Sequence, residues 1–123
     1  MSTILVVDDS ATMRALVRHA LEQDGHRVIE APHGAAALEA LGHTSADLLI
    51  TDLIMPELDG FGLTQRVRAT DALRTLPVLI LTTEATPAMK ERGRSAGATG
   101  WLVKPFHPDT LRQSVRRVLA EPA

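Results

Sequence analysis

The sequence ILVVDDS, residues 4–10, places four apolar residues directly before two aspartates and a serine. A run that is apolar throughout is typical of a strand covered on both faces of a sheet. Ser10 is suited to cap the start of a helix, and the residues after it repeat at helical spacing. The apolar residues that share this helical face are Met13, Leu16, Val17, Ala20 and Leu21. The stretch therefore predicts a strand, a short acidic loop and an amphipathic helix.

The same alternation recurs along the chain. Four further apolar runs, at residues 28–29, 48–50, 78–81 and 101–103, are separated by segments with helical spacing. This fivefold alternation predicts an α/β fold with a doubly wound, five-stranded parallel sheet and five helices. The runs at 4–7, 48–50 and 78–81 suit central strands, and the other two suit edges. This division agrees with the strand order 2-1-3-4-5, which is already known for doubly wound sheets.

The composition is that of a globular protein with a mild negative charge. Of the 123 residues, 45% are hydrophobic and 23% are charged, and the net charge is −2. This charge does not favour a nucleic-acid partner, which usually requires a basic excess. The absence of cysteine excludes disulfides and thiolate chemistry. Because the apolar runs are too short to span a membrane and the N-terminus lacks the pattern of a secretory signal, we expect a cytoplasmic protein with no membrane partner.

Polar side chains follow four of the predicted strands. Asp8 and Asp9 follow the first strand, Asp52 the third, Thr82 the fourth and Lys104 the fifth. Because the carboxyl ends of parallel strands meet at one edge of the sheet, we expect these groups to share a small volume. Clustered carboxylates repel one another unless a cation is present, and oxygen ligands without histidine or cysteine favour Mg²⁺. With Mg²⁺ bound, one carboxylate can attack phosphorus and become an aspartyl phosphate, which Lys104 and Thr82 can contact.

The sequence resembles a response-regulator receiver domain and is most similar to the single-domain chemotaxis (CheY-type) members. The matching motifs are VVDDS at residues 6–10, TDLIMP at 51–56 with Asp59-Gly60, LTTE at 81–84 and GATGWLVKPF at 97–106. Each motif is weak alone, but the four in this order and at these spacings are specific. The resemblance implies the flavodoxin-like receiver fold, with a single receiver domain over residues 1–123 and no output domain.

The resemblance also implies a role for each residue of the expected site. Asp52 is expected to be the phosphoacceptor, Thr82 the switch hydroxyl and Trp101 the switch aromatic. Lys104 is expected to bind the phosphoryl group, and the Lys104–Pro105 peptide bond is expected to be cis. The expected Mg²⁺ site comprises Asp9 and Asp52 as ligands, Asp8 through a metal-bound water, and the backbone carbonyl of Ile54.

The implied function is a phosphorylation-activated signalling switch of a two-component, chemotaxis-type system. A histidine kinase is expected to donate its phosphoryl group to Asp52, which would change the affinity for a downstream protein such as a flagellar motor switch. The resemblance places partner docking on the face formed by the fourth helix, fifth strand and fifth helix, and a phosphatase is a possible further partner. A phosphorelay intermediate and a phosphate sink remain alternatives. The protein is not expected to be an enzyme, beyond assisting its own aspartyl phosphorylation and dephosphorylation.

Three rival functions fit the sequence less well. A phosphatase of the haloacid-dehalogenase type needs a second aspartate two residues after the nucleophile, where this chain has Ile54. A flavin or dinucleotide carrier needs a glycine- or hydroxyl-rich loop after the first strand, where this chain has two acids. A degenerate receiver that serves as a fixed scaffold would not need the complete set of polar residues. Simpler structural roles also exist, because Asp8 and Asp9 could cap a helix and Lys104 could be a solvated charge.

Two helical segments near the expected partner face stand out. Residues 86–96 form a weak helix, because Gly93 lies inside it and apolar anchors are few. A marginal helix beside the switch residues suits a bistable element. The last helix carries Arg112, Arg116 and Arg117, for which a solvated face is the default interpretation, although the resemblance adds a contribution to partner docking.

Overall fold

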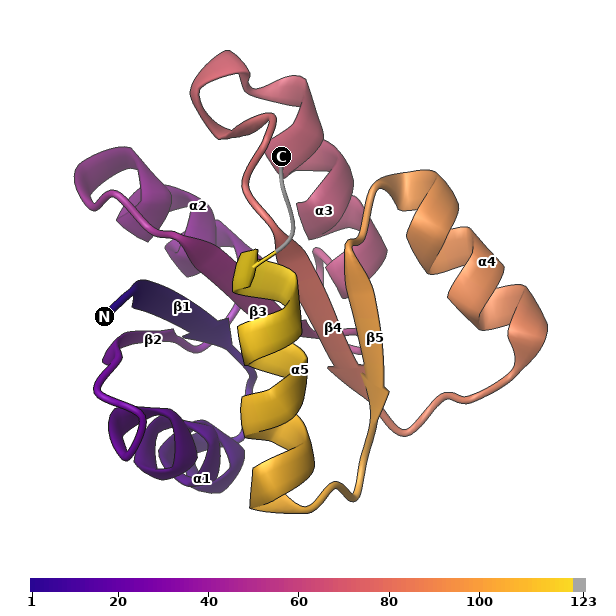
Figure 1. The fold of residues 1–123 in the computed structure, drawn as a ribbon. Coiled ribbons are helices and arrows are strands. Elements are labelled where there is room, and N and C mark those ends of the chain that lie inside the picture. Colours follow the sequence, from indigo (N-terminus) through magenta and orange to yellow (C-terminus); the bar gives the residue numbers. More distant parts are fainter. Residues whose placement is uncertain (121–123) are drawn as a thin grey trace.

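The computed structural model describes residues 1–120 and shows one parallel sheet with helices on both of its faces (Figure 1). The strand order is β2-β1-β3-β4-β5, and every neighbouring pair is parallel, which confirms the predicted doubly wound topology. The strands are β1 (Thr3–Val7), β2 (Arg27–Ala31), β3 (Leu48–Asp52), β4 (Val78–Thr82) and β5 (Gly100–Val103). Each of the five predicted apolar runs therefore lies within a strand.

Five α-helices and one 3₁₀ turn connect these strands within residues 1–120. They are α1 (Ala11–Glu22), α2 (Gly34–His43), α3 (Gly60–Ala69), η1 (Asp71–Leu73), α4 (Pro87–Ala96) and α5 (Pro108–Ala120). In this described part of the chain, none of the helices has both the length and the apolar character that a membrane crossing requires.

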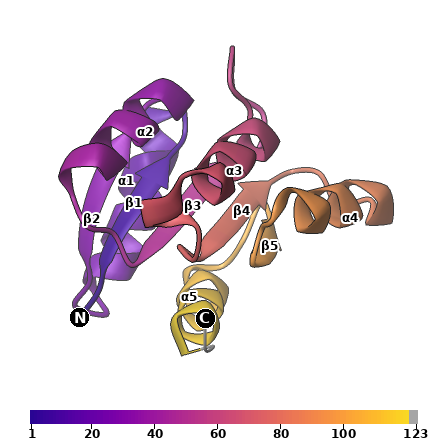
Figure 2. The ribbon, with the colours of Figure 1, turned by 90° about the horizontal axis from the view of Figure 1, so that it is seen from above.

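The sheet divides the hydrophobic core into two clusters. Side chains of α2, α3 and α4 pack on one face, and those of α1 and α5 pack on the other. Figure 2 shows this arrangement for α3 and α5, which lie on opposite sides of β4. Alternate residues of the buried strands serve the two faces, so that Leu5 and Val7 join the first cluster while Ile4 and Val6 join the second. This is the reason why the central strands are apolar at every position.

Local side-chain chemistry sets where the helices begin and end. The Ser10 hydroxyl accepts a hydrogen bond from the Met13 backbone N–H at 3.2 Å, as predicted for a cap. Asp59 caps α3 and Thr86 caps α4 in the same way, with Pro87 in the first turn of α4, where a missing N–H does no harm. Gly97 ends α4 with a φ of 105°, a conformation that favours glycine.

Gly60 places the start of α3 against the end of β3. Its N–H donates to the carbonyl of Leu53 at 2.8 Å. A Cβ at this position would lie 2.6 Å from the carbonyl oxygen of Asp52 and 2.9 Å from the Cα of Leu53. Both are backbone atoms, so no side-chain rotation relieves the overlap. Because Gly60 has no side chain, the start of α3 can pack directly against the backbone of Asp52 and Leu53.

We expect Gly60→Ala to lower the free energy of unfolding by about 1–3 kcal/mol, because α3 must move away from the β3 backbone. Urea denaturation monitored by circular dichroism measures the loss. Gly42→Ala is the matched control, since it also replaces a helical glycine but its added Cβ meets nothing within 4 Å. Equal unfolding midpoints for the two variants would contradict this packing argument.

Candidate functional site

Three carboxylates meet at the carboxyl ends of β1 and β3. Oxygen atoms of Asp8, Asp9 and Asp52 all lie within 4.8 Å of one another. Asp8 is buried, Asp52 is partly buried and Asp9 is exposed. The strand ends therefore bring together the three acids that the sequence singles out, and the open side of the cluster is the side of Asp9.

Lys104 supplies the cation of this cluster. Its Nζ atom lies 2.9 Å from Oδ2 of Asp8 and 3.4 Å from Oδ1 of Asp52, and 13% of its side chain is exposed. The Lys104 backbone N–H donates to the carbonyl of Thr82 at 2.7 Å, which ties the end of β5 to the end of β4. The peptide bond between Lys104 and Pro105 is cis, as the resemblance implied. The lysine is thus a partly buried ion-pair partner and not a solvated charge.

Asp8 is held by hydrogen bonds as well as by this ion pair. Its Oδ1 accepts from the Ser10 backbone N–H at 2.9 Å, while its Oδ2 faces Lys104. The carbonyl of Asp8 accepts from the Arg14 side chain at 2.7 Å. These contacts fix the Asp8 carboxylate, so the two neighbouring acids have very different surroundings although they are adjacent in sequence.

The surroundings of Asp52 act on the pKa of its carboxyl group in opposite directions. Burial raises the pKa of its carboxyl above the usual value, Lys104 lowers that pKa, and the charge of Asp8 raises it again. The Oδ1 atom also accepts a hydrogen bond from the Leu53 backbone N–H at 2.8 Å, which favours the ionised form. The net direction is upward, so the lysine and the backbone N–H do not fully compensate for burial and repulsion.

The donor set fits a hard divalent cation. Three carboxyl groups surround a single ammonium group, so the cluster is short of positive charge. All the acidic ligand atoms are oxygens, which Mg²⁺ prefers. The backbone carbonyl of Ile54, two residues after Asp52, remains a prediction as a further ligand. The Ile54 side chain itself is 61% exposed.

Thr82 and Trp101 are joined through one residue of the loop between β4 and α4. The Thr82 hydroxyl oxygen accepts from the Glu84 backbone N–H at 3.1 Å. The Trp101 indole N–H donates to the carbonyl of Glu84 at 2.9 Å. The indole also stacks on Phe61 of α3, with 6.3 Å between the ring centroids. Thr82 is buried whereas Thr83 is exposed.

Sequence reasoning missed Glu84 and Phe61 as neighbours of the switch residues. Glu84 acts through its backbone, so its residue type gives no signal. Phe61 is an ordinary core residue by its pattern, and only the fold brings its ring to Trp101, a residue that lies 40 positions later in the chain.

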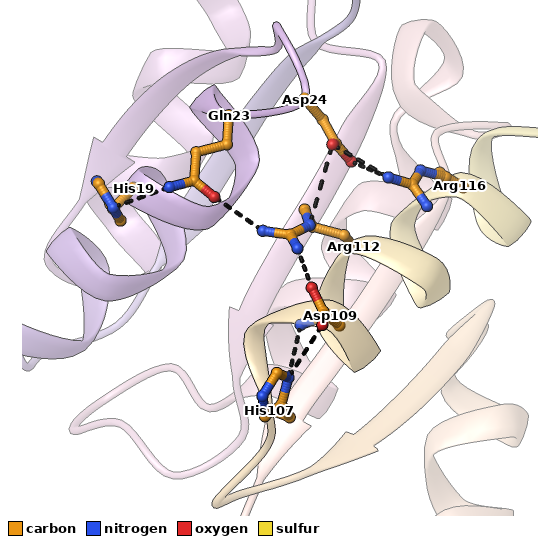
Figure 3. A network of polar contacts seen from close by, with 7 residues as sticks. All are labelled: His19, Gln23, Asp24, His107, Asp109, Arg112 and Arg116. Atoms are coloured by element: carbon orange, nitrogen blue, oxygen red, sulfur yellow. Dashed lines mark hydrogen bonds and ion pairs between the residues drawn. The ribbon is translucent and has the colours of Figure 1, made fainter.

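Two of the three arginines of α5, Arg112 and Arg116, form contacts with other side chains of the protein. Arg116 binds Asp24 at 3.0 Å and Arg112 donates to Gln23 at 2.9 Å, which ties α5 to the end of α1 (Figure 3). Arg112 also contacts Asp109 and, at 3.9 Å, Asp24. The default interpretation of a solvated face is therefore corrected for Arg112 and refined for Arg116, because the fold places Asp24, in the turn after α1, opposite α5.

Comparison with known proteins gives consistent matches. A sequence model of the response regulator receiver domain matches residues 4–116. Chemotaxis protein CheY1 of Helicobacter pylori (strain J99) is 39% identical over 118 residues, which cover 94% of this chain and 95% of that protein. The structure of Vibrio cholerae chemotaxis protein CheY4 has a TM-score of 0.92 and 42% identity, and covers 96% of this chain and 98% of that one.

A further similar structure contains a metal ion. The receiver domain of a Pseudomonas aeruginosa sensor histidine kinase, described with a magnesium ion coordinated in its active site cleft, has a TM-score of 0.89 and 28% identity. The similarity covers 98% of both chains.

We expect Asp52→Asn to stabilise the metal-free protein at neutral pH. A carboxyl whose pKa rises on folding stabilises the folded state while it is protonated, and this contribution is lost as the pH rises through the raised value. At about pH 7 the ionised Asp52 therefore destabilises the fold, and asparagine removes that charge. The urea midpoint in excess chelator should rise, and the gain should shrink as the pH approaches about 4.

The control for this variant is Asp71→Asn, which changes the net charge equally at a side chain that is 99% exposed. A gain of the same size in both variants would mean that overall charge, and not the buried cluster, explains the result.

Proposed function

The chain belongs to the response regulator receiver family, and on this premise we propose that it is a two-component signalling switch that is operated by phosphorylation of Asp52. The observation that carries the proposal is the meeting of Asp52 with Asp8, Asp9 and Lys104 at the carboxyl ends of the strands. Asp52 has an oxygen within 4.8 Å of those of the two other acids and 3.4 Å from Nζ of Lys104.

Receiver domains bind Mg²⁺ at an acidic pocket, and the three aspartates here supply such a pocket. We assign Asp9, Asp52 and the backbone carbonyl of Ile54 as direct ligands, and Asp8 as the partner of a metal-bound water. When bound, the ion supplies positive charge that allows the acids to coexist with an incoming phosphoryl group. The exposed position of Asp9 supports entry of the ion from solvent.

The environment of Asp52 assigns separate roles to its two oxygens. Oδ1 accepts from the Leu53 N–H and faces Lys104, which leaves Oδ2 as the atom we propose for attack on phosphorus. The new Oδ2–P bond forms as the P–N bond of a kinase phosphohistidine breaks, and the imidazole leaves with the bonding pair and takes up a proton. The Lys104 ammonium then neutralises phosphoryl oxygens, and the Thr82 hydroxyl donates a hydrogen bond to one of them.

The output of the switch is proposed to be a change of protein contact. Receiver domains of the chemotaxis type interact with histidine kinases and with downstream targets such as the flagellar switch. The contacts from Thr82 through Glu84 to Trp101 support a path from the phosphorylated residue to the face formed by α4, β5 and α5. A relay or a phosphate sink would use the same chemistry.

Receiver domains of this type are signalling proteins and not classical enzymes. For this chain we propose that catalysis is limited to its own phosphorylation and dephosphorylation. Ile54 supports this limit, since it occupies the position where a haloacid-dehalogenase-like phosphatase carries its general acid.

Incubation with a small-molecule phosphodonor and Mg²⁺ tests the proposed function. We expect mass spectrometry of the intact protein to show one phosphoryl adduct. We expect no adduct to form when a chelator removes the Mg²⁺. Asp52→Asn should give no adduct, and Asp59→Asn is the control, because Asp59 follows the same strand but caps α3. An adduct of equal yield in Asp52→Asn would refute Asp52 as the acceptor.

The Ile54 side chain is expected to prolong the phosphorylated state. Ile54 is apolar, 61% exposed and two residues from Asp52, and we infer that it hinders the approach of an attacking water. We expect Ile54→Asn to shorten the half-life of the adduct several-fold, because an amide can hold a water near phosphorus. Ile54→Val is the control that keeps the surface apolar. A half-life that is unchanged in the asparagine variant would contradict this role.

A further inference from the structure

Gly93 lies in the interior of α4, where glycine weakens a helix. The structure gives a reason for its presence. A Cβ at position 93 would lie 2.6 Å from Cζ3 and 2.9 Å from Cε3 of Trp101. Such distances are too short for carbon atoms, so an alanine here would displace either the helix or the indole. Position 93 therefore accommodates the ring of Trp101 through the absence of a side chain.

The indole is in contact with the protein on several sides. It stacks on Phe61, its N–H binds the Glu84 carbonyl at 2.9 Å, and its benzo ring meets Gly93. Arg92, the residue before Gly93, lies with its guanidinium carbon 4.5 Å from the centroid of the Phe61 ring. The middle of α4 thus packs over an aromatic pair that joins α3 to β5.

The hydrogen bonds between Trp101 and Thr82 have a definite direction. The indole donates to the carbonyl of Glu84, and the N–H of Glu84 donates to the hydroxyl oxygen of Thr82. A hydroxyl that accepts in this way keeps its own proton for donation. Thr82 is buried, and it follows Leu81, the register partner of Asp52. The seated indole therefore holds the loop in a form in which the Thr82 hydroxyl accepts from Glu84 and keeps its own proton for another acceptor.

We propose that Gly93 is a positioning residue of the switch. Its missing side chain seats the Trp101 indole under α4, and the seated indole holds Glu84 so that Thr82 can donate to a phosphoryl group. This inference rests on the proposed function, because it concerns regulation of the same site. By linkage, whatever expels the indole weakens phosphoryl binding at Asp52, and phosphoryl binding favours the seated indole.

A displaced ring has space to enter. A surface hollow of about 160 Å³ adjoins Trp101 between α4 and β5, and its lining includes Lys90, Arg94 and Ala98. An alanine at position 93 is therefore expected to move the indole toward solvent and not to unfold the domain.

A double-mutant cycle tests the pairing of the two residues. The four proteins are the wild type, Gly93→Ala, Trp101→Phe and the combined variant, and the probe is beryllium fluoride with Mg²⁺, measured by calorimetry. Phenylalanine lacks the fused ring that meets Gly93, so the added methyl should do no harm in its presence. Gly42→Ala is the control, since that helical glycine has open space around its missing Cβ.

In the wild-type background we expect Gly93→Ala to shift the Trp101 emission to longer wavelength and to weaken binding of the probe by about fivefold or more. In the Trp101→Phe background the same substitution should leave the binding constant unchanged. Gly42→Ala should alter neither emission nor affinity. If Gly93→Ala fails to fold, recovery of folding in the combined variant supports the pairing, and failure of both overturns it.

Two results would separate this inference from the proposed function. If the wild type binds the probe, Asp52→Asn does not, and Gly93→Ala binds as the wild type does, the role of Gly93 is wrong while the switch stands. If the wild type binds no probe at all, the proposed function fails. An equal loss from Gly93→Ala in both backgrounds would also overturn the inference, because the effect would then not pass through Trp101.

Discussion

The mutual repulsion of three aspartates at the ends of two buried strands is the constraint on which this protein depends. Asp8 and Asp52 are held close by strand register and by Lys104, and the backbone gives neither of them freedom to withdraw. Burial is the main cause of the raised pKa of Asp52, the charge of Asp8 adds to it, and Lys104 opposes both only in part. A site with more acidic groups than cations favours the binding of a cation. Once that cation is bound, the site can also accept a phosphoryl group.

Much of this arrangement follows from the sequence. Wholly apolar runs identify the buried strands, and the polar residues after them must converge because parallel strands end at the same edge. The positions of Asp8, Asp52 and Lys104 could therefore be inferred from local pattern and topology. The resemblance to receiver domains added roles that spacing alone could not give, and those roles remain proposals.

Contacts that depend on distant segments could not be predicted. The pairing of Asp24 with Arg116 joins residues 92 positions apart, and the sequence around neither residue indicates that they pair. From the sequence alone, Gly93 is a residue that weakens its helix, which is correct for the helix in isolation. Its relation to Trp101 depends on how α4 is placed over β5, and the register and tilt of packed elements are not encoded in short motifs.

The division of the core by the sheet has a consequence for how such a protein can change. The cluster under α1 and α5 and the cluster under α2, α3 and α4 are separated by strands that are buried on both sides. The buried side chains of one layer therefore pack in a different cluster from those of the other. Residues on the outer surface of α1 and α5 can therefore be substituted to change binding specificity without replacing any residue of the aromatic packing around Trp101. This separation suits the domain to the engineering of new signalling partners.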